Sequence, residues 1–155
     1  MKLTSFPIIQ QHTRRSFMTK GLRAGLLCGM APYVKAATPT KYRTALIGCG
    51  WWGMNILREA MAADRAKVVG LSDVYERPLL VSQDEVNQLT GDTPNIYKDY
   101  RELLKKERPE IVIIATPDHW HALPCIDALK MGAHVYVEKP TSHTINESRS
   151  MLHAA

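Results

Sequence analysis

The sequence predicts an α/β protein built on a doubly wound parallel β-sheet, with helices on both faces of the sheet. Short apolar runs alternate with helical patterns after residue 42, and the run over residues 110–116 is almost entirely apolar. Alternation of strand and helix is typical of parallel sheets, and an unbroken apolar run is typical of a strand buried on both faces. A glycine-rich turn after the first strand supports the same fold class.

The first two strands flank a helix that begins at the glycine turn. We expect strands at residues 43–48 and 67–73, with a helix at residues 51–63 between them. A second helix includes Pro78 in its first turn, where a missing N–H group costs little, and ends at Gly91.

A short strand at residues 95–97 precedes the third helix. Asp99 and Glu102 have the spacing of a capping box, in which each residue satisfies a backbone N–H group at the helix start. The helix ends before Pro109, because the residue before a proline disfavours helical geometry.

Two further strand–helix units complete the predicted sheet. The first is the apolar run at residues 110–116 followed by a helix that ends at Gly132, and the second is the strand at residues 134–138 followed by a helix capped by Thr144 and Glu147. A strand order of 3-2-1-4-5 places the tips of strands one and four side by side, and ligands bind in such a crevice.

The glycines of the first turn form the pattern G-x-G-x-x-G at Gly48, Gly50 and Gly53. The first permits a tight turn, the second lets a pyrophosphate approach the backbone, and the third lets the helix pack on the sheet. The helix start also offers unpaired N–H groups to phosphates. Alone, this pattern also suits a plain glycine-rich turn.

Asp73 supplies the context that the glycine pattern needs. It ends the second strand, 20 residues beyond Gly53, where an acid reaches a ribose hydroxyl. Strand, helix, strand and acid together predict a Rossmann-type dinucleotide-binding domain over residues 38–155. The carboxylate repels a 2′-phosphate and so favours NAD, but Arg77 nearby can meet that phosphate or stack on adenine, which leaves NADP open.

The basic residues are unevenly distributed. Six of the twenty lysines and arginines, and none of the fifteen acids, lie in residues 1–37, so the rest of the chain has a net charge of −1. That part of the chain shows no basic stripe of the kind that binds nucleic acid.

Residues 1–37 resemble a twin-arginine export signal, with Arg14, Arg15, Phe17 and Lys20 followed by a modest apolar run. The run is too short to span a bilayer, and small residues at Ala36 and Ala37 suit a signal peptidase. We therefore expect recognition by the twin-arginine export machinery, no stable membrane insertion and a periplasmic location. The alternative is a disordered basic tail.

No metal site is expected. His119 and His121 are two residues apart, which does not bring both onto one helix face. The cysteines have neither zinc spacing nor a disulfide framework, and we interpret Cys49 and Cys125 as small apolar residues.

Three motifs together resemble the glucose–fructose oxidoreductase / inositol dehydrogenase / rhizopine catabolism (Gfo/Idh/MocA) family. They are the glycine turn, Thr116-Pro117-x-x-x-His121 after strand four and Glu138-Lys139-Pro140 after strand five. The resemblance covers residues 41–155, and its exported branch often carries T-P-D-H-W-H-A and V-Y-V-E-K-P, both present here.

The resemblance implies a bound nicotinamide cofactor and a sugar- or cyclitol-like substrate. It implies that Lys139 is the catalytic lysine, a partly buried ammonium that contacts the reacting hydroxyl and the nicotinamide ribose. Thr116, Pro117, His121 and Glu138 then lie beside the cofactor, and Pro140 is often cis. Trp51 and Trp52 lie at the phosphate turn, where they cover the cofactor, meet a partner subunit or, more simply, are buried.

Members of this family carry a second domain that supplies the substrate pocket, an acid/base residue and homo-oligomer contacts. We therefore expect this sequence to be the N-terminal portion of an NAD(P)-dependent oxidoreductase. Two alternatives stay open: an NAD-dependent glycosidase of the same fold, which Lys139 disfavours, and a nucleotide-binding module without turnover.

Overall fold

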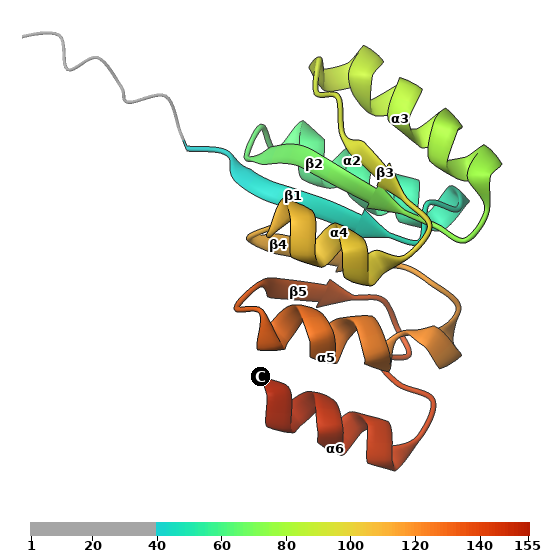
Figure 1. Cartoon of the computed structure of the whole chain (residues 1–155), viewed down its shortest axis with the longest axis vertical. Coiled ribbons are helices and arrows are strands. Elements are labelled where there is room, and N and C mark those ends of the chain that lie inside the picture. Colours follow the sequence, from blue (N-terminus) through green and yellow to red (C-terminus); the bar gives the residue numbers. More distant parts are fainter. Residues whose placement is uncertain (1–39) are drawn as a thin grey trace, which may run out of the picture. The chain divides into compact units, whose positions relative to one another are not determined.

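The computed structural model describes residues 40–155, which contain a parallel five-stranded sheet (Figure 1). The predicted leader at residues 1–37 lies outside the described residues. The strands are β1 (Tyr42–Ile47), β2 (Ala66–Ser72), β3 (Asn95–Tyr97), β4 (Ile111–Ile114) and β5 (His134–Val137). They lie in the order β3-β2-β1-β4-β5, and every neighbouring pair is parallel. The predicted fold class and strand order are confirmed.

Helices cover both faces of the sheet. On one face lie α2 (Trp51–Ala62) and α3 (Glu76–Thr90), and on the other lie α4 (Tyr100–Glu107) and α5 (Ala122–Lys130). A final helix, α6 (Ile145–Ala154), packs beside α5 (Figure 1).

The central strands divide the core into two layers. Ala45, Ile47 and Val112 face α4 and α5, whereas Leu46 and Ile113 face α2 and α3, and all five are nearly or completely buried. Because β4 is covered on both faces, each of its positions favours an apolar side chain, which explains its unbroken apolar run.

The helix starts differ from the prediction in two places. Thr144 and Glu147 form the expected capping box, but Asp99 caps α4 alone, by accepting from the N–H of Arg101 at 2.9 Å. The Glu102 carboxylate instead accepts from Lys106, one turn further on. The helix after β4 is also interrupted, because Asp118–Trp120 form a 3₁₀ turn, η1, before α5 begins.

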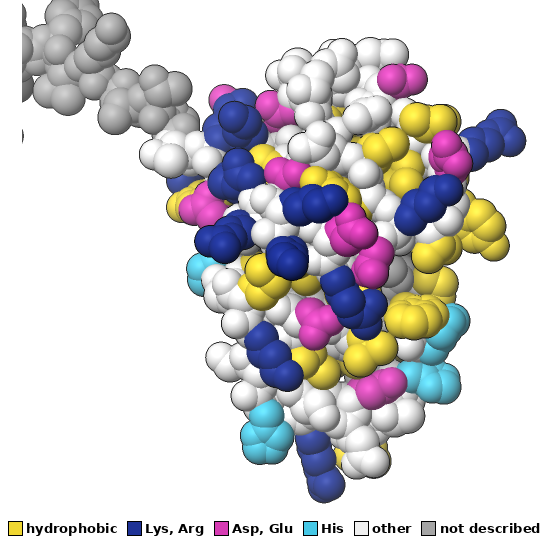
Figure 2. All heavy atoms as spheres, viewed as in Figure 1, with side chains coloured by type: hydrophobic (Ala, Val, Ile, Leu, Met, Phe, Trp, Pro, Cys, Tyr) yellow, Lys and Arg dark blue, Asp and Glu magenta, His cyan; other side chains and the backbone are white. Residues whose placement is uncertain are grey.

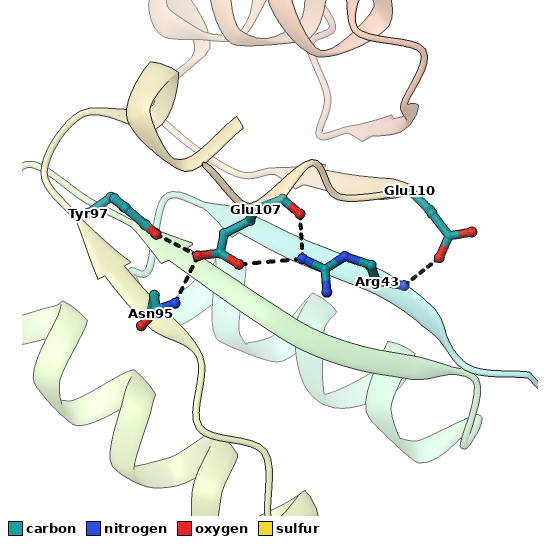
Figure 3. Close-up of polar contacts among 5 residues, drawn as sticks. All are labelled: Arg43, Asn95, Tyr97, Glu107 and Glu110. Carbon is teal, nitrogen blue, oxygen red and sulfur yellow. Dashed lines mark hydrogen bonds and ion pairs between the residues drawn. The ribbon is translucent and has the colours of Figure 1, made fainter. Parts of the chain in front are cut away.

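A polar cluster, which we call the Glu107 network, ties the end of α4 to β1 and β3 (Figure 3). Glu107 Oε1 accepts from Asn95 Nδ2 at 2.8 Å and from the Tyr97 hydroxyl at 2.5 Å. The Arg43 guanidinium donates to the carbonyl and carboxylate of Glu107, and the Arg43 backbone N–H donates to Glu110.

Charged side chains of both signs intermingle on the face of the molecule seen in Figure 2. Hydrophobic side chains gather along the edge toward which the strand arrows of Figure 1 point, and histidine side chains lie at that edge and at the opposite one. None of the helices within residues 40–155 is both long enough and apolar enough to cross a bilayer.

Candidate cofactor-binding site

The turn between β1 and α2 requires glycine at two positions. Gly48 has a φ of +95°, and a Cβ atom there would lie 2.7 Å from the backbone of Ala115. A Cβ atom on Gly53 would lie 2.0 Å from the carbonyl oxygen of Gly48. These contacts bring the start of α2 directly against the sheet, as the glycine pattern predicts.

Gly50 leaves open space at the start of α2. A Cβ atom there would meet nothing within 4 Å, and as the N-cap residue it supplies no side-chain hydrogen bond. The first turn of α2 contains no acidic residue. Its N–H groups and the positive end of the helix dipole therefore face an open position that suits a diphosphate.

Asp73 links this turn to the end of β2. Its Oδ2 accepts from the backbone N–H of Cys49 at 2.8 Å, and its Oδ1 accepts from that of Tyr75 at 3.0 Å. Each carboxylate oxygen has a second lone pair, so Asp73 can also accept from a ribose hydroxyl.

Two cavities meet at the glycine turn. The first, of about 650 Å³, is lined by Gly48 and Asp73 and reaches the ends of β2 and β3. The second, of about 540 Å³, lies between the start of α2 and the end of β5. Four residues line both cavities: Gly50, Ala115, Thr116 and Pro117. Two adjacent cavities that share these residues match a ligand with two halves joined at the glycine turn.

Thr116 supplies an independent sign that a polar ligand belongs here. Its hydroxyl is buried and has no hydrogen-bond partner among the described residues. Buried hydroxyl groups are normally paired, because leaving one unpaired is costly. The unpaired hydroxyl, the open helix start and the glycine cradle together fit a dinucleotide.

Trp52, Glu138 and Lys139 lie together at the second cavity. Trp52 Nε1 donates to Glu138 Oε2 at 2.7 Å, and the backbone N–H of Lys139 donates to Glu138 Oε1 at 2.8 Å. The Lys139 N–H, and then the indole N–H, hold the pKa of the Glu138 carboxyl below its usual range. The carboxylate is therefore charged at neutral pH.

Two expectations about burial are wrong. Trp51 and Trp52 are 76 % and 46 % exposed, rather than buried in the core, because the start of α2 projects beyond the edge of the sheet. Lys139 is also exposed within the described residues. The peptide bond before Pro140 is cis, as the family resemblance implied.

His121 holds two loops together. Its ring is 2 % exposed, and its Nδ1 and Nε2 atoms each lie 2.7 Å from a backbone carbonyl oxygen, those of Pro140 and Thr116. His121 lines the second cavity, and both of its ring nitrogens face protein carbonyl groups. A contact between His121 and the cofactor therefore stays a prediction, and it would use the carbon atoms of the ring.

The first cavity contains residues that the sequence interpretation missed. Arg77 is exposed and lines neither cavity, whereas Lys98 and Arg101 line the first. Tyr75 and Trp120 also contribute to that wall. Residues 98–101 directly follow β3, so applying the carboxyl-edge rule to the third strand identifies them.

Cys49 and Cys125 are structural cysteines. Burial raises the pKa of Cys49 to about 12 and raises that of Cys125 as well. Both thiols are buried within the described part of the chain, and no group of metal-ligating side chains converges among residues 40–155.

Comparison with known proteins supports the nucleotide interpretation. Residues 42–155 match a family model described as "Oxidoreductase family, NAD-binding Rossmann fold" and designated GFO_IDH_MocA. A curated relative from Akkermansia muciniphila, Glycosyl hydrolase family 109 protein 1, is 34 % identical over 69 % of this chain and 23 % of its own length.

Solved structures share the fold. The WlbA dehydrogenase of Chromobacterium violaceum, in complex with NADH and UDP-GlcNAcA, is 28 % identical with a TM-score of 0.62, over 77 % of this chain and 33 % of that one. The scyllo-inositol dehydrogenase of Lactobacillus casei, with bound NAD(H) and scyllo-inositol, is 20 % identical with a TM-score of 0.66, over 74 % of this chain and 33 % of that one. The chain thus spans about a quarter of the length of the curated relative and a third of the solved ones.

Proposed function

This chain belongs to the Gfo/Idh/MocA oxidoreductase family and contains its NAD-binding Rossmann domain, and from that premise we propose its role. It is the cofactor domain of an oxidoreductase that moves a hydride between a tightly held nicotinamide and a hydroxyl group of a sugar or cyclitol. The observation that carries the proposal is the pair of cavities that meet at the glycine turn, with Asp73 beside one and Lys139 beside the other.

Each half of the site has a distinct task in this proposal. Asp73 accepts a hydrogen bond from the adenosine ribose, and the open N–H groups of α2 bind the diphosphate. Thr116 donates its unpaired hydroxyl to the ligand where the cavities meet. When bound, the nicotinamide supplies a hydride acceptor or donor, while the Lys139 ammonium stabilises negative charge on the reacting oxygen.

The proposed substrate class rests on the relatives. Two of the solved relatives were crystallised with UDP-GlcNAcA and with scyllo-inositol. Both are rings with several hydroxyl groups. A polyhydroxylated ring is therefore the substrate class that we propose for the whole protein.

A second candidate is an NAD-dependent glycosidase of the same fold, because the curated relative is named as a glycosyl hydrolase. Incubation with a chromogenic glycoside and no added redox acceptor separates the candidates. Release of the aglycone supports the glycosidase, whereas reduction of NAD by a free sugar or cyclitol supports the dehydrogenase. A third candidate, a nucleotide-binding module without turnover, predicts binding with neither reaction.

We also propose, from the sequence of residues 1–37, that the protein is exported by the twin-arginine route in its folded state. A nicotinamide enzyme outside the cytoplasm needs a tightly held cofactor, since free cofactor is scarce there. Replacing Arg14 and Arg15 with lysine should keep the protein in the cytoplasm. Loss of all nucleotide from the mature protein on dialysis contradicts the tightly held cofactor.

Calorimetric titration of the full chain tests the central proposal. We expect NAD and ADP to bind at one site, with NAD preferred over NADP because the Asp73 carboxylate repels a 2′-phosphate. Substituting Gly50 by valine fills the open space at the helix start and should weaken both ligands together. Absence of binding by NAD and ADP contradicts the proposal.

A further inference from the structure

Trp52 and Glu138 form a bond across the second cavity. Trp52 lies in the first turn of α2, directly after the glycine turn, and Glu138 directly follows β5. Their hydrogen bond of 2.7 Å joins residues that are 86 positions apart in the chain. Between β5 and α2 lie the carboxyl ends of β4 and β1, where the cavities meet.

The same carboxylate is bonded to the backbone of Lys139. Glu138 Oε2 accepts the indole N–H, and Glu138 Oε1 accepts the Lys139 backbone N–H. A carboxylate presents two acceptor oxygens and so serves two donors at once, whereas a glutamine amide presents only one. A continuous path of hydrogen bonds therefore connects the indole to the backbone that carries the lysine side chain.

The hydrogen bonds of Trp52 and Glu138 lie outside the hydrophobic core. Neither Trp52 nor Glu138 is a member of either core layer, and Trp52 keeps nearly half of its surface exposed. Both residues line the second cavity, as does Lys139. The bond thus orders a wall of the cavity and leaves the packed core unchanged.

We propose that Trp52 is a positioning residue that fixes Lys139 through Glu138 at the nicotinamide end of the site. The inference rests on the proposed function, which places the adenosine diphosphate half between the first cavity and the glycine turn, and the nicotinamide half in the second cavity. Indole, carboxylate and lysine backbone then act as one unit. Losing the indole N–H loosens the orientation of the Glu138 carboxylate, which keeps only the weaker bond from the Tyr136 hydroxyl at 3.4 Å on that oxygen, while the Glu138 backbone stays bonded to Ile114.

Trp51 provides a matched control within the same turn. Its ring lines the same cavity and lies 5.5 Å from that of Trp52, centroid to centroid. Among the described residues, the Trp51 indole makes no hydrogen bond, whereas the Trp52 indole donates to Glu138. Replacing either tryptophan with phenylalanine keeps an aromatic ring, but only one replacement removes the bond.

The test compares W52F, W51F, E138Q and the double variants W52F/E138Q and W51F/E138Q in the full chain, with calorimetric titration of NAD and of ADP. ADP lacks the nicotinamide half, so it reports the rest of the site. We expect W52F and E138Q each to weaken NAD binding about 2- to 10-fold, as for the loss of one hydrogen bond, with ADP changed less than about 2-fold. The W52F/E138Q variant should be no weaker than the weaker single one, because both substitutions remove the same link.

W51F should combine with E138Q additively, because its ring has no part in the link. The inference is overturned if W52F weakens ADP as much as NAD, if it leaves NAD binding unchanged, or if W52F and E138Q are additive. Should W52F fail to fold, E138Q alone carries the comparison of NAD with ADP. A wild-type chain that binds neither ligand overturns the proposed function and this inference with it, whereas a wild-type chain that binds both while W52F behaves like W51F overturns this inference alone.

Discussion

The Glu107 network and the carboxyl edge of the sheet are both rich in polar groups, but only the carboxyl edge also holds polar groups that lack a partner among the described residues. The Glu107 side chain is 12 % exposed, and both of its carboxylate oxygens have donors. At the carboxyl edge, the Thr116 hydroxyl has no partner among the described residues, and the N-cap of α2 offers no side-chain bond.

We interpret the Glu107 network as a source of stability and the carboxyl edge as the place for ligand binding. Paired and partly buried groups hold α4 on the sheet and leave nothing for a ligand. Unpaired donors cost stability in the free protein, and we expect a bound ligand to satisfy them. The following predictions test how far the two regions can be altered independently, starting with the largest expected effect.

Gly53 lies in the binding site, but its substitution should reduce the stability of the fold. G53A places a Cβ atom against the Gly48 carbonyl oxygen, and we expect a loss of about 4 kcal/mol of unfolding free energy. Urea unfolding followed by circular dichroism measures it. G50A is the control, since a Cβ atom there meets nothing, and it should cost about 1 kcal/mol or less. Equal stability of G53A and wild type contradicts the close approach of α2 to the sheet.

Glu107 should affect stability without affecting binding. E107A leaves the donors of Arg43, Asn95 and Tyr97 without their acceptor, and we expect a loss of about 2 kcal/mol in urea unfolding. The matched control is E102A, which removes an exposed ion pair with Lys106 and should cost less than about 0.5 kcal/mol. A changed NAD affinity in folded E107A would show that the two regions are coupled.

Asp73 should affect binding more than stability. D73N keeps one acceptor oxygen where the turns after β1 and β2 use two, and it removes the charge that repels a 2′-phosphate. We expect NAD to bind about tenfold more weakly, which is about 1.4 kcal/mol, and the preference over NADP to narrow. R77A, at a residue outside both cavities, should leave NADP affinity nearly unchanged; a large loss would restore the phosphate role first considered for Arg77.

The smallest expected effect is an alkaline loss of stability from the Glu107 network. Burial, and then the Glu107 carboxylate, raise the pKa of Tyr97 to about 12 from an ordinary value of 10. Because the unfolded chain loses this proton first, stability should fall as the pH rises from 10 toward 12. Burial raises the pKa of Tyr100 too, so Y97F should reduce the decline without abolishing it. Thermal unfolding against pH measures this, and an unchanged slope in Y97F contradicts the assignment.

Local sequence signals predicted the backbone parts of the site correctly. Gly48 is required by its positive φ and Gly53 by the close approach of α2 to the Gly48 carbonyl oxygen, and the spacing of the two glycines located the turn. The Thr144 capping box is equally local, because both partners lie within one helical turn. Asp99 shows where local reasoning ends, since its expected partner Glu102 bonds to Lys106 instead.

The side-chain pairings of the site lay beyond the reach of such signals. Three features depend on which loops meet at the carboxyl edge. They are the carbonyl partners of His121, the exposure of Trp51, and the fact that Lys98 and Arg101, rather than Arg77, line the first cavity. The alternation of strands and helices predicts the fold class, and with it the edge at which the loops emerge. It does not give the distance between side chains on loops that are far apart in the chain.

The amino-acid sequence by itself determined the glycine turn and the acid after β2, because each depends on contacts within one strand–helix unit. The strand order followed from the predicted fold class, and the family from the resemblance of three motifs. Only the tertiary structure decided that Trp52 bonds to Glu138 and that the Thr116 hydroxyl is left without a partner among the described residues. The physical reason is that a hydrogen bond depends on ångström-scale placement of two groups, and the packing of the helices on the sheet sets that placement.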